Sequence, residues 1–369
     1  RLGILGGGQL AQMLASSAAQ LGLEPHILSP SSLDPAAQVT AHWHHGDPNN
    51  PKDLQNFLAK QDLLTFESEF VSTDKLIGLQ LKKNKSKKSQ FVFPKPHLMK
   101  LFQFRSSQKE ILEKFKISTA SFMIIKNHTD LNKAWERFGG KFVLKKAFGA
   151  YDGHGTHYIQ SFSDLKKTDD LLDGELFIAE AFITFQRELA VIFVRSFNGS
   201  CIHLPMVESH QTQHRCDWVR GPVEHKKFFG LRKKILEMLN KIDYVGCIAF
   251  ELFDTGKELL VNEIAPRVHN TGHYSQDALL HSQFDLHLMA GLGYELPQPQ
   301  LTNKAFAMIN LLGKTKNSIK IPQKLTGKLH LYGKKENRPG RKMGHLNYIG
   351  NNLQEILKQA LNERKKFLL

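Results

Sequence analysis

The chain has 369 residues, enough for two or three domains at roughly 150 residues each. Hydrophobic residues make up 41% of it and charged residues 23%, an ordinary globular usage that argues against wholesale disorder. No run approaches the ~20 apolar residues of a membrane span, and the N-terminus does not have the pattern of a secretion signal. The three cysteines form no CxxC pair, which argues against a disulfide framework or structural zinc site. We therefore expect a soluble cytoplasmic protein.

The net charge of +15 is the least ordinary feature of the composition. Such a surplus suits anionic partners, either nucleic acid or phosphorylated small molecules. Part of it is local, because residues 81–89 contain five lysines without an interleaved aromatic residue. The chain has no helix-turn-helix, zinc-finger or RRM pattern, so we interpret this run as a solvated segment and expect no nucleic-acid partner.

The first hundred residues alternate short apolar runs with helical patterns. This alternation predicts a parallel sheet with helices on both faces, in an N-terminal α/β domain spanning 1–97. A proline-rich segment at 93–96 is the predicted linker at its end. The predicted strands are 2–5, 25–28 and 62–66, and the predicted helices are 10–21 and 52–60.

After the linker the pattern changes to a mixture of strands and helices. This predicts an α+β domain over 98–298, followed after the proline-rich 296–299 by a small β-rich C-terminal domain over 299–369. The predicted elements of the central domain are strands 142–145, 176–179, 189–194, 247–250 and 259–261 and helices 100–115 and 228–239.

Two glycine-rich segments have the character of phosphate-binding loops. Residues 6–11 fit G-x-G-x-x-G/A after a strand, where glycines let backbone N–H groups approach a phosphate. The acidic residue of the nicotinamide version is missing, since Leu28-Ser29-Pro30 stands in its place, so a monophosphate cradle or a ligand-free turn remains. Residues 145–155 place a strand-borne lysine before a glycine-rich turn that is not a Walker A loop; either a loop over phosphates or a simple turn fits.

Glu251 and Glu263 are the sharpest candidate pair. Apolar runs flank Asp254-Thr-Gly256, which is a hairpin signal, and each glutamate lies six residues from Lys257. A symmetric hairpin therefore places them opposite one another on one face, where two carboxylates repel. A divalent cation relieves this repulsion, and Mg²⁺ favours one or two carboxylates together with substrate phosphates. The alternative is two glutamates on a solvated face.

Three weaker signals remain open. Glu180 and Glu188 bracket a strand connection, where they would accept hydrogen bonds from adenine and ribose or simply lie on a rim. The basic turn 338–342, followed by His345, fits a phosphate clamp or solvated charge. The eighteen histidines include no HExxH motif, and Trp43 between His42 and His44 has the character of surface or packing, so we expect no histidine metal site.

Taken in this order, the motifs resemble those of the N5-carboxyaminoimidazole ribonucleotide synthase family, ATP-grasp enzymes of purine biosynthesis. The resemblance runs through nearly the whole chain. Its most specific segments are 6–10, 65–69, 151–153, 187–190, 262–267, 269–273 and 338–345.

The resemblance implies a fold, a reaction and its partners. The fold is an N-terminal parallel α/β domain, a central ATP-grasp domain and a small C-terminal domain, in a homodimer. The reaction joins bicarbonate to the amine of aminoimidazole ribonucleotide through carboxyphosphate, while ATP becomes ADP and phosphate. Mg²⁺ is the implied metal, with Mn²⁺ as an alternative, and the partners are small molecules rather than nucleic acid or membranes.

The resemblance also implies roles for individual residues. The implied metal ligands are Glu251 and Glu263, and the implied catalytic residues are Tyr151, Asp152, Arg267, His269 and Asn270. The implied substrate-binding residues are Gly8, Gln9, Glu69, Tyr151, Lys334, Arg338 and Arg341. The implied ATP-binding residues are Arg105, Lys145, Ala150, Tyr151, Asp152, Gly153, His154, Gly155, Thr156, Glu180, Ala181, Phe182, Ile183, Glu188, Asn262 and Glu263.

The chain departs from the family pattern at several points. The ATP loop has Ala150 and Thr156 where the family has Gly and Gln, and Phe104 replaces an Asp before Arg105. His210 and His214 compete for the place of one ATP-site histidine, and strand alternation would put Glu67 and Glu69 on the same face. Another ATP-grasp ligase with a different acceptor, or a silent nucleotide-binding protein, are the alternative functions.

Overall fold

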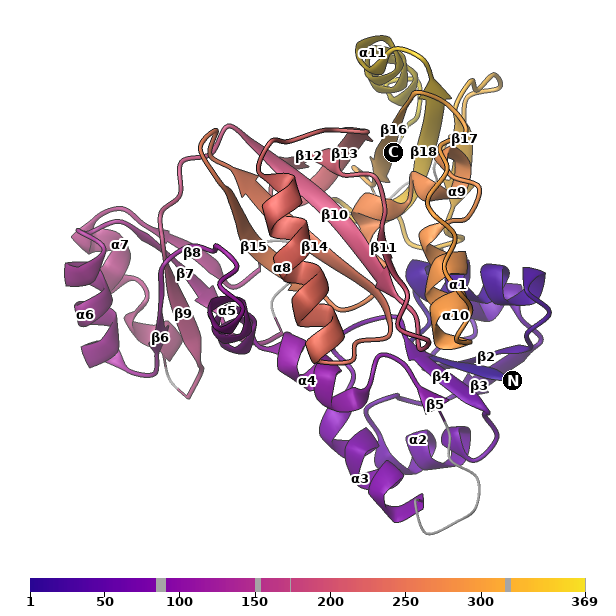
Figure 1. The fold of residues 1–369 in the computed structure, drawn as a ribbon, viewed down its shortest axis with the longest axis horizontal. Helices are drawn as coiled ribbons and strands as arrows, with labels where there is room; N and C mark the ends of the chain where they lie inside the picture. The colour runs from indigo at the N-terminus through magenta and orange to yellow at the C-terminus, as the bar shows by residue number, and fades with distance from the viewer. Residues whose placement is uncertain (84–90, 150–153, 173, 316–319, 369) are drawn as a thin grey trace.

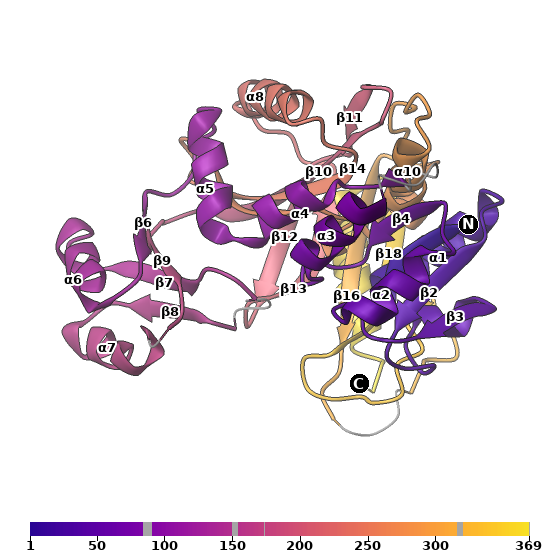
Figure 2. The same cartoon turned by 90° about the horizontal axis from the view of Figure 1, so that it is seen from below.

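The computed structural model describes residues 1–83, 91–149, 154–172, 174–315 and 320–368. These residues form three sheets (Figure 1). The large sheet lies in the middle, with the small sheet at one side of it and the N-terminal sheet at the other, and a view turned by 90° shows the same order (Figure 2). Among the residues that the structure describes, no helix combines the length and apolar character needed to cross a membrane.

The N-terminal sheet is parallel throughout, in the order β3-β2-β1-β4-β5, as predicted. Its two faces bury different side chains, because Ile4 packs with helix α1 while Leu5 packs with helix α2. The predicted strands and helices are present; helix α3 and the edge strands β3 and β5 were not predicted. The elements are β1 (Leu2–Leu5), α1 (Gln9–Gln20), β2 (Pro25–Ser29), the 3₁₀ helix η1 (Ala36–Val39), β3 (His42–His45), α2 (Pro51–Leu58), β4 (Leu63–Phe66), α3 (Thr73–Lys83) and β5 (Phe91–Val92).

The small sheet, in the order β6-β9-β7-β8, is antiparallel. Helix α6 buries Leu131 and Ala134 against it, and these pack with Phe142, Leu144 and Ile159 of the strands. Its elements are β6 (Phe122–Ile125), α6 (His128–Arg137), β7 (Phe142–Lys146), β8 (Thr156–Ile159), α7 (Phe162–Lys166), η2 (Asp169–Leu172) and β9 (Phe177–Ala181).

The large sheet is antiparallel, in the order β15-β14-β10-β12-β13-β16-β18-β17, with β11 paired to β10. Its strands are β10 (Arg187–Arg195), β11 (Cys201–His203), β12 (Val207–Thr212), β13 (Arg215–Gly221), β14 (Gly246–Asp254), β15 (Leu259–Ala265), β16 (Ala305–Leu312), β17 (Lys328–Leu331) and β18 (Lys342–Gly350). The other elements of this region are α4 (Pro96–Gln103), α5 (Arg105–Lys114), α8 (Phe228–Lys241), η3 (Asn270–Gly272), α9 (Ser275–Ala278), α10 (Gln283–Gly291) and α11 (Leu353–Arg364).

Two features differ from the expectation. The single helix predicted over 100–115 is two helices, because Phe104 is extended, with φ −102° and ψ 125°, and ends α4 before α5 begins. The C-terminal unit is not a sheet of its own, since β16 pairs with β13 across the predicted boundary at 299 and extends the large sheet. The predicted boundary itself stays a prediction.

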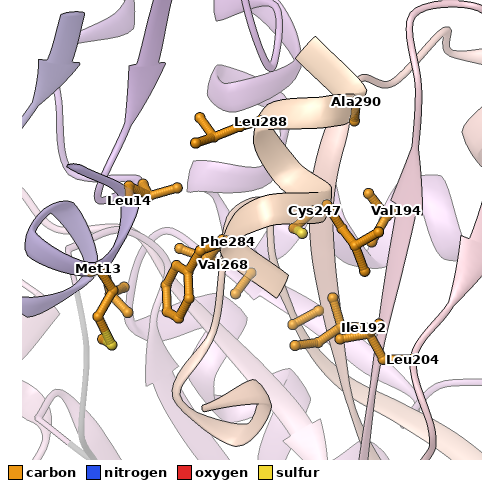
Figure 3. Close-up of a cluster of buried hydrophobic side chains, with 14 of the residues drawn as sticks. Met13, Leu14, Ile192, Val194, Leu204, Cys247, Val268, Phe284, Leu288 and Ala290 are labelled. Carbon is orange, nitrogen blue, oxygen red and sulfur yellow. The ribbon is translucent and has the colours of Figure 1, made fainter. Parts of the chain in front are cut away.

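The N-terminal domain docks on the large sheet through α1 and α10. Met13 and Leu14 of α1 face Phe284 and Leu288 of α10 in one buried cluster (Figure 3). Beside it, the backbone N–H of Cys247 donates to Nδ1 of the buried His287 at 2.9 Å. The proton of this ring is therefore on Nε2, which contacts the hydroxyl of Thr65 at 2.7 Å and links β4 to β14.

Replacing Leu14 by Ala tests this docking. Leu14 is fully buried, so the lost burial and the cavity left behind should lower the free energy of unfolding by about 2–5 kcal/mol. Urea denaturation measures the change. Leu33→Ala is the matched control, because Leu33 is 49% exposed and its truncation should cost little. Equal losses in the two variants would contradict the docking role of Leu14.

Candidate active site

A cavity of about 350 Å³ lies where the three sheets meet, with lining residues from each of them. Gln9 and Glu69 come from the N-terminal domain, Lys145 from the small sheet and Glu251 from the large sheet. The structure thus brings together residues spread over more than 250 positions of sequence. The implied site residues that line the cavity are Gln9, Glu69, Arg105, Lys145, Thr156, Glu180, Ala181, Phe182, Ile183, Glu188, Glu251, Asn262, Glu263, Arg267, His269 and Asn270.

Other implied residues are placed elsewhere. His154 and Gly155 form the turn before β8, outside the described lining. Gly8, Lys334, Arg338 and Arg341 are also outside this lining. Ala150, Tyr151, Asp152 and Gly153 lie outside the described residues, as does most of the lysine run at 82–88.

The two carboxylates of the predicted hairpin face each other in the cavity. Glu251 on β14 is the direct cross-strand partner of Glu263 on β15, as predicted, and a bulge follows Glu251. Burial, together with the charges of Glu263 and Glu188, raises the pKa of Glu251 to about 8, although Arg105 and Lys342 oppose the shift. The Glu251 carboxyl thus lacks enough positive charge to offset its burial and the neighbouring carboxylates. A divalent cation between the two carboxylates would supply it, so this donor set fits Mg²⁺.

Glu263 and Glu180 each have a cationic partner. Arg105 donates from Nη1 to Glu263 at 2.9 Å. Lys145 donates from Nζ to Glu180 and to the amide oxygen of Asn262, both at 3.0 Å. The ends of β7, β9 and β15 are held together by these bonds.

Lys109 is a site residue that the sequence analysis missed. Its ammonium group lies 3.4 Å from the Glu180 carboxylate and donates to Thr119 at 2.6 Å. Burial lowers the pKa of Lys109 to about 8, although Glu180 opposes the shift. Burial alone would raise the pKa of Glu180, but Lys145 and Lys109 hold it below its usual range. Lys109 lies four residues after Arg105, so the two share one face of a helix, and this spacing could have indicated its place near the site.

Glu67 and Glu69 have different partners. Strand β4 ends at Phe66, so the expectation that strand alternation puts both glutamates on one face was wrong. Glu69 receives a bidentate pair of hydrogen bonds from Arg267, one of them at 2.9 Å, and lines the cavity. Glu67 instead accepts the backbone N–H of Gly8 at 2.6 Å.

The first glycine turn accommodates this carboxylate. A Cβ atom at Gly8 would lie 2.1 Å from Oε1 of Glu67, so a side chain there would displace this carboxyl group. The helix N-terminus that a phosphate would occupy thus holds a carboxyl group of the chain itself, whose pKa burial raises. Between the two glutamates, Glu69 is the one placed to contact a ligand.

His269 and Asn270 begin the short helix η3 at the wall of the cavity. His269 contacts the Thr271 hydroxyl through Nδ1 at 2.9 Å, and its Nε2 lies 3.5 Å from Glu251. Burial, with the charges of Arg267 and Lys342, holds the pKa of His269 well below its usual range, so the ring is neutral. Asn270 exchanges two amide hydrogen bonds with Asn310 of β16, at 3.0 and 2.7 Å.

Of the two competing histidines, His214 lines the cavity, while His210 stacks on Trp218 with ring centroids 4.9 Å apart. His214 has φ +62° and stacks on Tyr158 at 5.8 Å. This end of the cavity is aromatic and apolar, which suits a planar base.

Lys342, at the end of the basic turn, lines the cavity. No separate role was predicted for this residue from the sequence. Lys334 donates to the backbone carbonyl of Lys342 at 2.8 Å. Burial, with the neighbouring Arg341, lowers the pKa of Lys334 to about 8. Arg341 donates to the carbonyl of Glu336 at 3.0 Å.

Comparison with known proteins agrees with this architecture. The ribonucleotide synthetase preATP-grasp domain matches residues 1–103, the ATP-grasp domain 110–284 and the phosphoribosylaminoimidazole carboxylase C-terminal domain 307–359. The N5-carboxyaminoimidazole ribonucleotide synthase of Staphylococcus haemolyticus is 31% identical, over 98% of this chain and 96% of its own.

Solved structures give the same result. The Staphylococcus aureus N5-carboxyaminoimidazole synthetase complexed with ADP superposes with a TM-score of 0.88 at 30% identity, covering 98% of this chain and 96% of its own. The Aspergillus clavatus N5-carboxyaminoimidazole synthase in complex with ADP and 5-aminoimidazole ribonucleotide has a TM-score of 0.85 at 26% identity, covering 99% and 98%.

The fold and the cavity between its sheets define an ATP-grasp ligase, which confirms the expected fold class. Nearly full-length identity above 30% is specific enough to narrow this class further. The chain belongs to the N5-carboxyaminoimidazole ribonucleotide synthase family.

The raised pKa of Glu251 predicts a pH-dependent stability. Its carboxyl has a pKa of about 8 in the folded chain and near 4.5 when unfolded, so the folded state binds the proton more tightly. This contribution to stability is complete below about pH 4.5 and is lost as the pH rises through 8. Glu251→Gln cannot ionise and should lose less stability than the wild type between pH 6 and 8.5, measured by urea denaturation without divalent ions.

Glu258→Gln on the same hairpin is the control, because Glu258 is exposed and its replacement should leave the wild-type pH profile unchanged. Identical profiles for the wild type and Glu251→Gln would contradict the burial of an uncompensated carboxyl at this position.

Proposed function

We propose that this cavity carboxylates the amine of 5-aminoimidazole ribonucleotide with bicarbonate, converting ATP to ADP and phosphate, to give N5-carboxyaminoimidazole ribonucleotide for purine synthesis. The observation that carries the proposal is that one cavity contains both a group of residues suited to ATP and a group suited to the acceptor. Lys145, Glu180 and Glu263 form an ATP-grasp side, and the Glu69–Arg267 pair forms an acceptor side. The relatives' names and the two ligands of the Aspergillus clavatus structure support the same assignment.

ATP would lie between the small and large sheets. Arg105 and Lys145 would hold its phosphates, since both cations line the cavity. Oε1 of the buried Glu180 finds no hydrogen-bond partner among the described residues, so it would accept the adenine amino group. Ala181, Phe182 and Ile183 would contact the base from the hinge. Glu188, whose pKa burial raises to about 6, would accept a ribose hydroxyl.

Mg²⁺ would be held by Glu251 and Glu263, and Mn²⁺ suits the same oxygen ligands. When bound, the ion would neutralise charge on the transferred phosphoryl group. Asn262 lies beside Glu263 and also bonds Lys145, so one short segment serves both the metal and the phosphates.

The acceptor would lie toward the N-terminal domain, near Gln9 and Glu69. Lys334, Arg338 and Arg341 would provide the cations for its 5′-phosphate. A bicarbonate oxygen attacks the γ-phosphorus as ADP leaves, which gives carboxyphosphate. The acceptor amine then attacks the carboxyl carbon, phosphate leaves, and the amine loses a proton.

The remaining roles concern the loop over ATP and the residues near bicarbonate. Carboxyphosphate is short-lived in water, so the loop of Ala150, Tyr151, Asp152, Gly153, His154, Gly155 and Thr156 would close over ATP. Neutral His269, together with Asn270, would contact the bicarbonate-derived group without adding charge. The homodimer and the cytoplasmic location implied by the family resemblance stay predictions.

The direct test follows ADP release with ATP, Mg²⁺ and labelled bicarbonate, with and without aminoimidazole ribonucleotide. ADP formed only with the ribonucleotide, with label in an acid-labile product, is the expected result. ATP turnover without label capture would indicate an ATP-grasp ligase with another acceptor. Absence of turnover under every condition would indicate a nucleotide-binding protein.

Glu263→Gln tests the metal assignment. Loss of one carboxylate should reduce Mg²⁺-dependent turnover at least 100-fold, because phosphoryl transfer depends on positioned cations. The circular dichroism spectrum should remain that of the wild type. Glu258→Gln on the same hairpin should keep full activity, and full activity in Glu263→Gln would discredit the metal site.

Lys334→Met tests the acceptor side separately. Removing this cation should raise KM for the ribonucleotide at least tenfold, because a lost charged hydrogen bond costs about 1.5–3 kcal/mol. KM for ATP should stay within twofold of wild type. Lys335→Met is the matched control in the same segment, and an equal effect of both substitutions would remove Lys334 from the site.

A further inference from the structure

A cluster of histidines lies at the edge of the N-terminal sheet, away from the cavity. His26 on β2 and His42 on the edge strand β3 are register partners, and Glu24 immediately precedes β2. The side-chain ligand atoms of Glu24, His26 and His42 all lie within 4.8 Å of one another. None of the three is among the described residues that line the active-site cavity.

Both rings approach the same carboxylate oxygen. Oε1 of Glu24 lies 2.6 Å from Nε2 of His26 and 3.5 Å from Nε2 of His42. Both Nε2 atoms therefore lie on the side of this oxygen, and the three ligand atoms share one small volume. The rings of His26 and His42 stack with centroids 4.6 Å apart and planes 8° apart, so the exposed His42 ring has to tilt for both Nε2 lone pairs to meet one ion.

A fourth residue fixes the orientation of the buried ring. Nδ1 of His26 lies 3.0 Å from Nε2 of His44, which shares a strand face with His42. A neutral His44 that accepts from Nδ1–H of His26 leaves Nε2 of His26 to face the carboxylate. Ligand histidines in metal sites are oriented in this way by a partner at the other ring nitrogen.

We propose that Glu24, His26 and His42 bind one Zn²⁺ ion, with solvent in the fourth position. Two histidines and one carboxylate are an established zinc donor set, and tetrahedral ligands at 2.0–2.2 Å lie about 3.3 Å apart. The 3.5 Å separation already suits the ion, and the 2.6 Å contact needs the carboxylate to withdraw by less than about 1 Å.

The exposure of the cluster allows both the adjustment and the entry of the ion. The side chain of Glu24 is 50% exposed and that of His42 is 44% exposed, while His26 is only 8% exposed. One rigid ligand and two accessible ones leave an open side for solvent.

The consequence for the protein is structural. Within the part of the chain that the structure describes, strand β3 pairs with β2 and with no other strand. An ion bound by His42 from β3 and by Glu24 and His26 at β2 would tie the edge strand to the sheet. It would stabilise the N-terminal domain without contact with the reacting groups, so its test is independent of the proposed function.

The experiment uses the full chain without an affinity tag and compares it with Glu24→Gln, His42→Asn and His45→Asn. The first two changes remove exposed ligands and should not disturb folding. His45 lies on the same edge strand, on the opposite face from His42, and is the matched control. Zn²⁺ binding is measured by calorimetry, and Co²⁺ is used as a visible spectroscopic probe.

The wild type and His45→Asn should bind one more Zn²⁺ per chain than Glu24→Gln and His42→Asn, whose affinity should fall at least tenfold. The wild type and His45→Asn should show the absorption of tetrahedral Co²⁺ and a larger rise in Tm with Zn²⁺ than Glu24→Gln and His42→Asn. Metal bound at Glu251 and Glu263 is common to all four proteins and cancels in the comparison. Equal Zn²⁺ uptake by all four would overturn the proposal.

Discussion

The repulsion between Glu251 and Glu263 is the constraint around which the site is organised. The register of β14 and β15 fixes the two carboxylates opposite each other, and both side chains are partly buried, so water screens them incompletely. The surrounding cations balance this charge unevenly, because Arg105 bonds Glu263 directly, whereas Arg105 and Lys342 act on Glu251 too weakly to prevent the rise of its pKa. The hairpin therefore leaves a deficit of positive charge at one defined point, which is what a cation site requires.

The cavity also depends on how the N-terminal domain is docked. Glu69 of the N-terminal domain bonds Arg267, and the same docking packs α1 on α10 and lets His287 bridge Thr65 of β4 to Cys247 of β14. The apolar cluster supplies the burial, and the histidine bridge is directional and therefore sets the register of one sheet against the other. The Glu69–Arg267 side of the cavity is thus a product of domain packing, whereas the Lys145–Glu180 side belongs to the small sheet alone.

The sequence predicted the features that depend on patterns within short segments. Strand and helix periodicity predicted the parallel sheet, and the symmetric hairpin predicted the opposition of Glu251 and Glu263. The pairing of β16 with β13 and the partnership of Glu67 with Gly8 join residues about 60 or more positions apart, which no local pattern contains. Strand β3 was missed for a different reason. Its residues His42–His45 are partly exposed at a sheet edge and lack an apolar face.

The ion pairs of the cavity explain why its two charged ligands should bind together. Arg105 bonds Glu263, and Lys145 bonds Glu180 and Asn262, so these charged groups assigned to ATP or the metal already have protein partners, whereas Glu251 has none of opposite charge at hydrogen-bond distance among the described residues. A phosphate alone would take Arg105 from Glu263 and leave two carboxylates uncompensated, while a cation alone would leave Arg105 without its partner. When both bind, the Arg105–Glu263 pair is replaced by two pairs, one between Arg105 and the phosphate and one between the carboxylates and the cation. The geometry therefore favours a nucleotide that arrives with its metal.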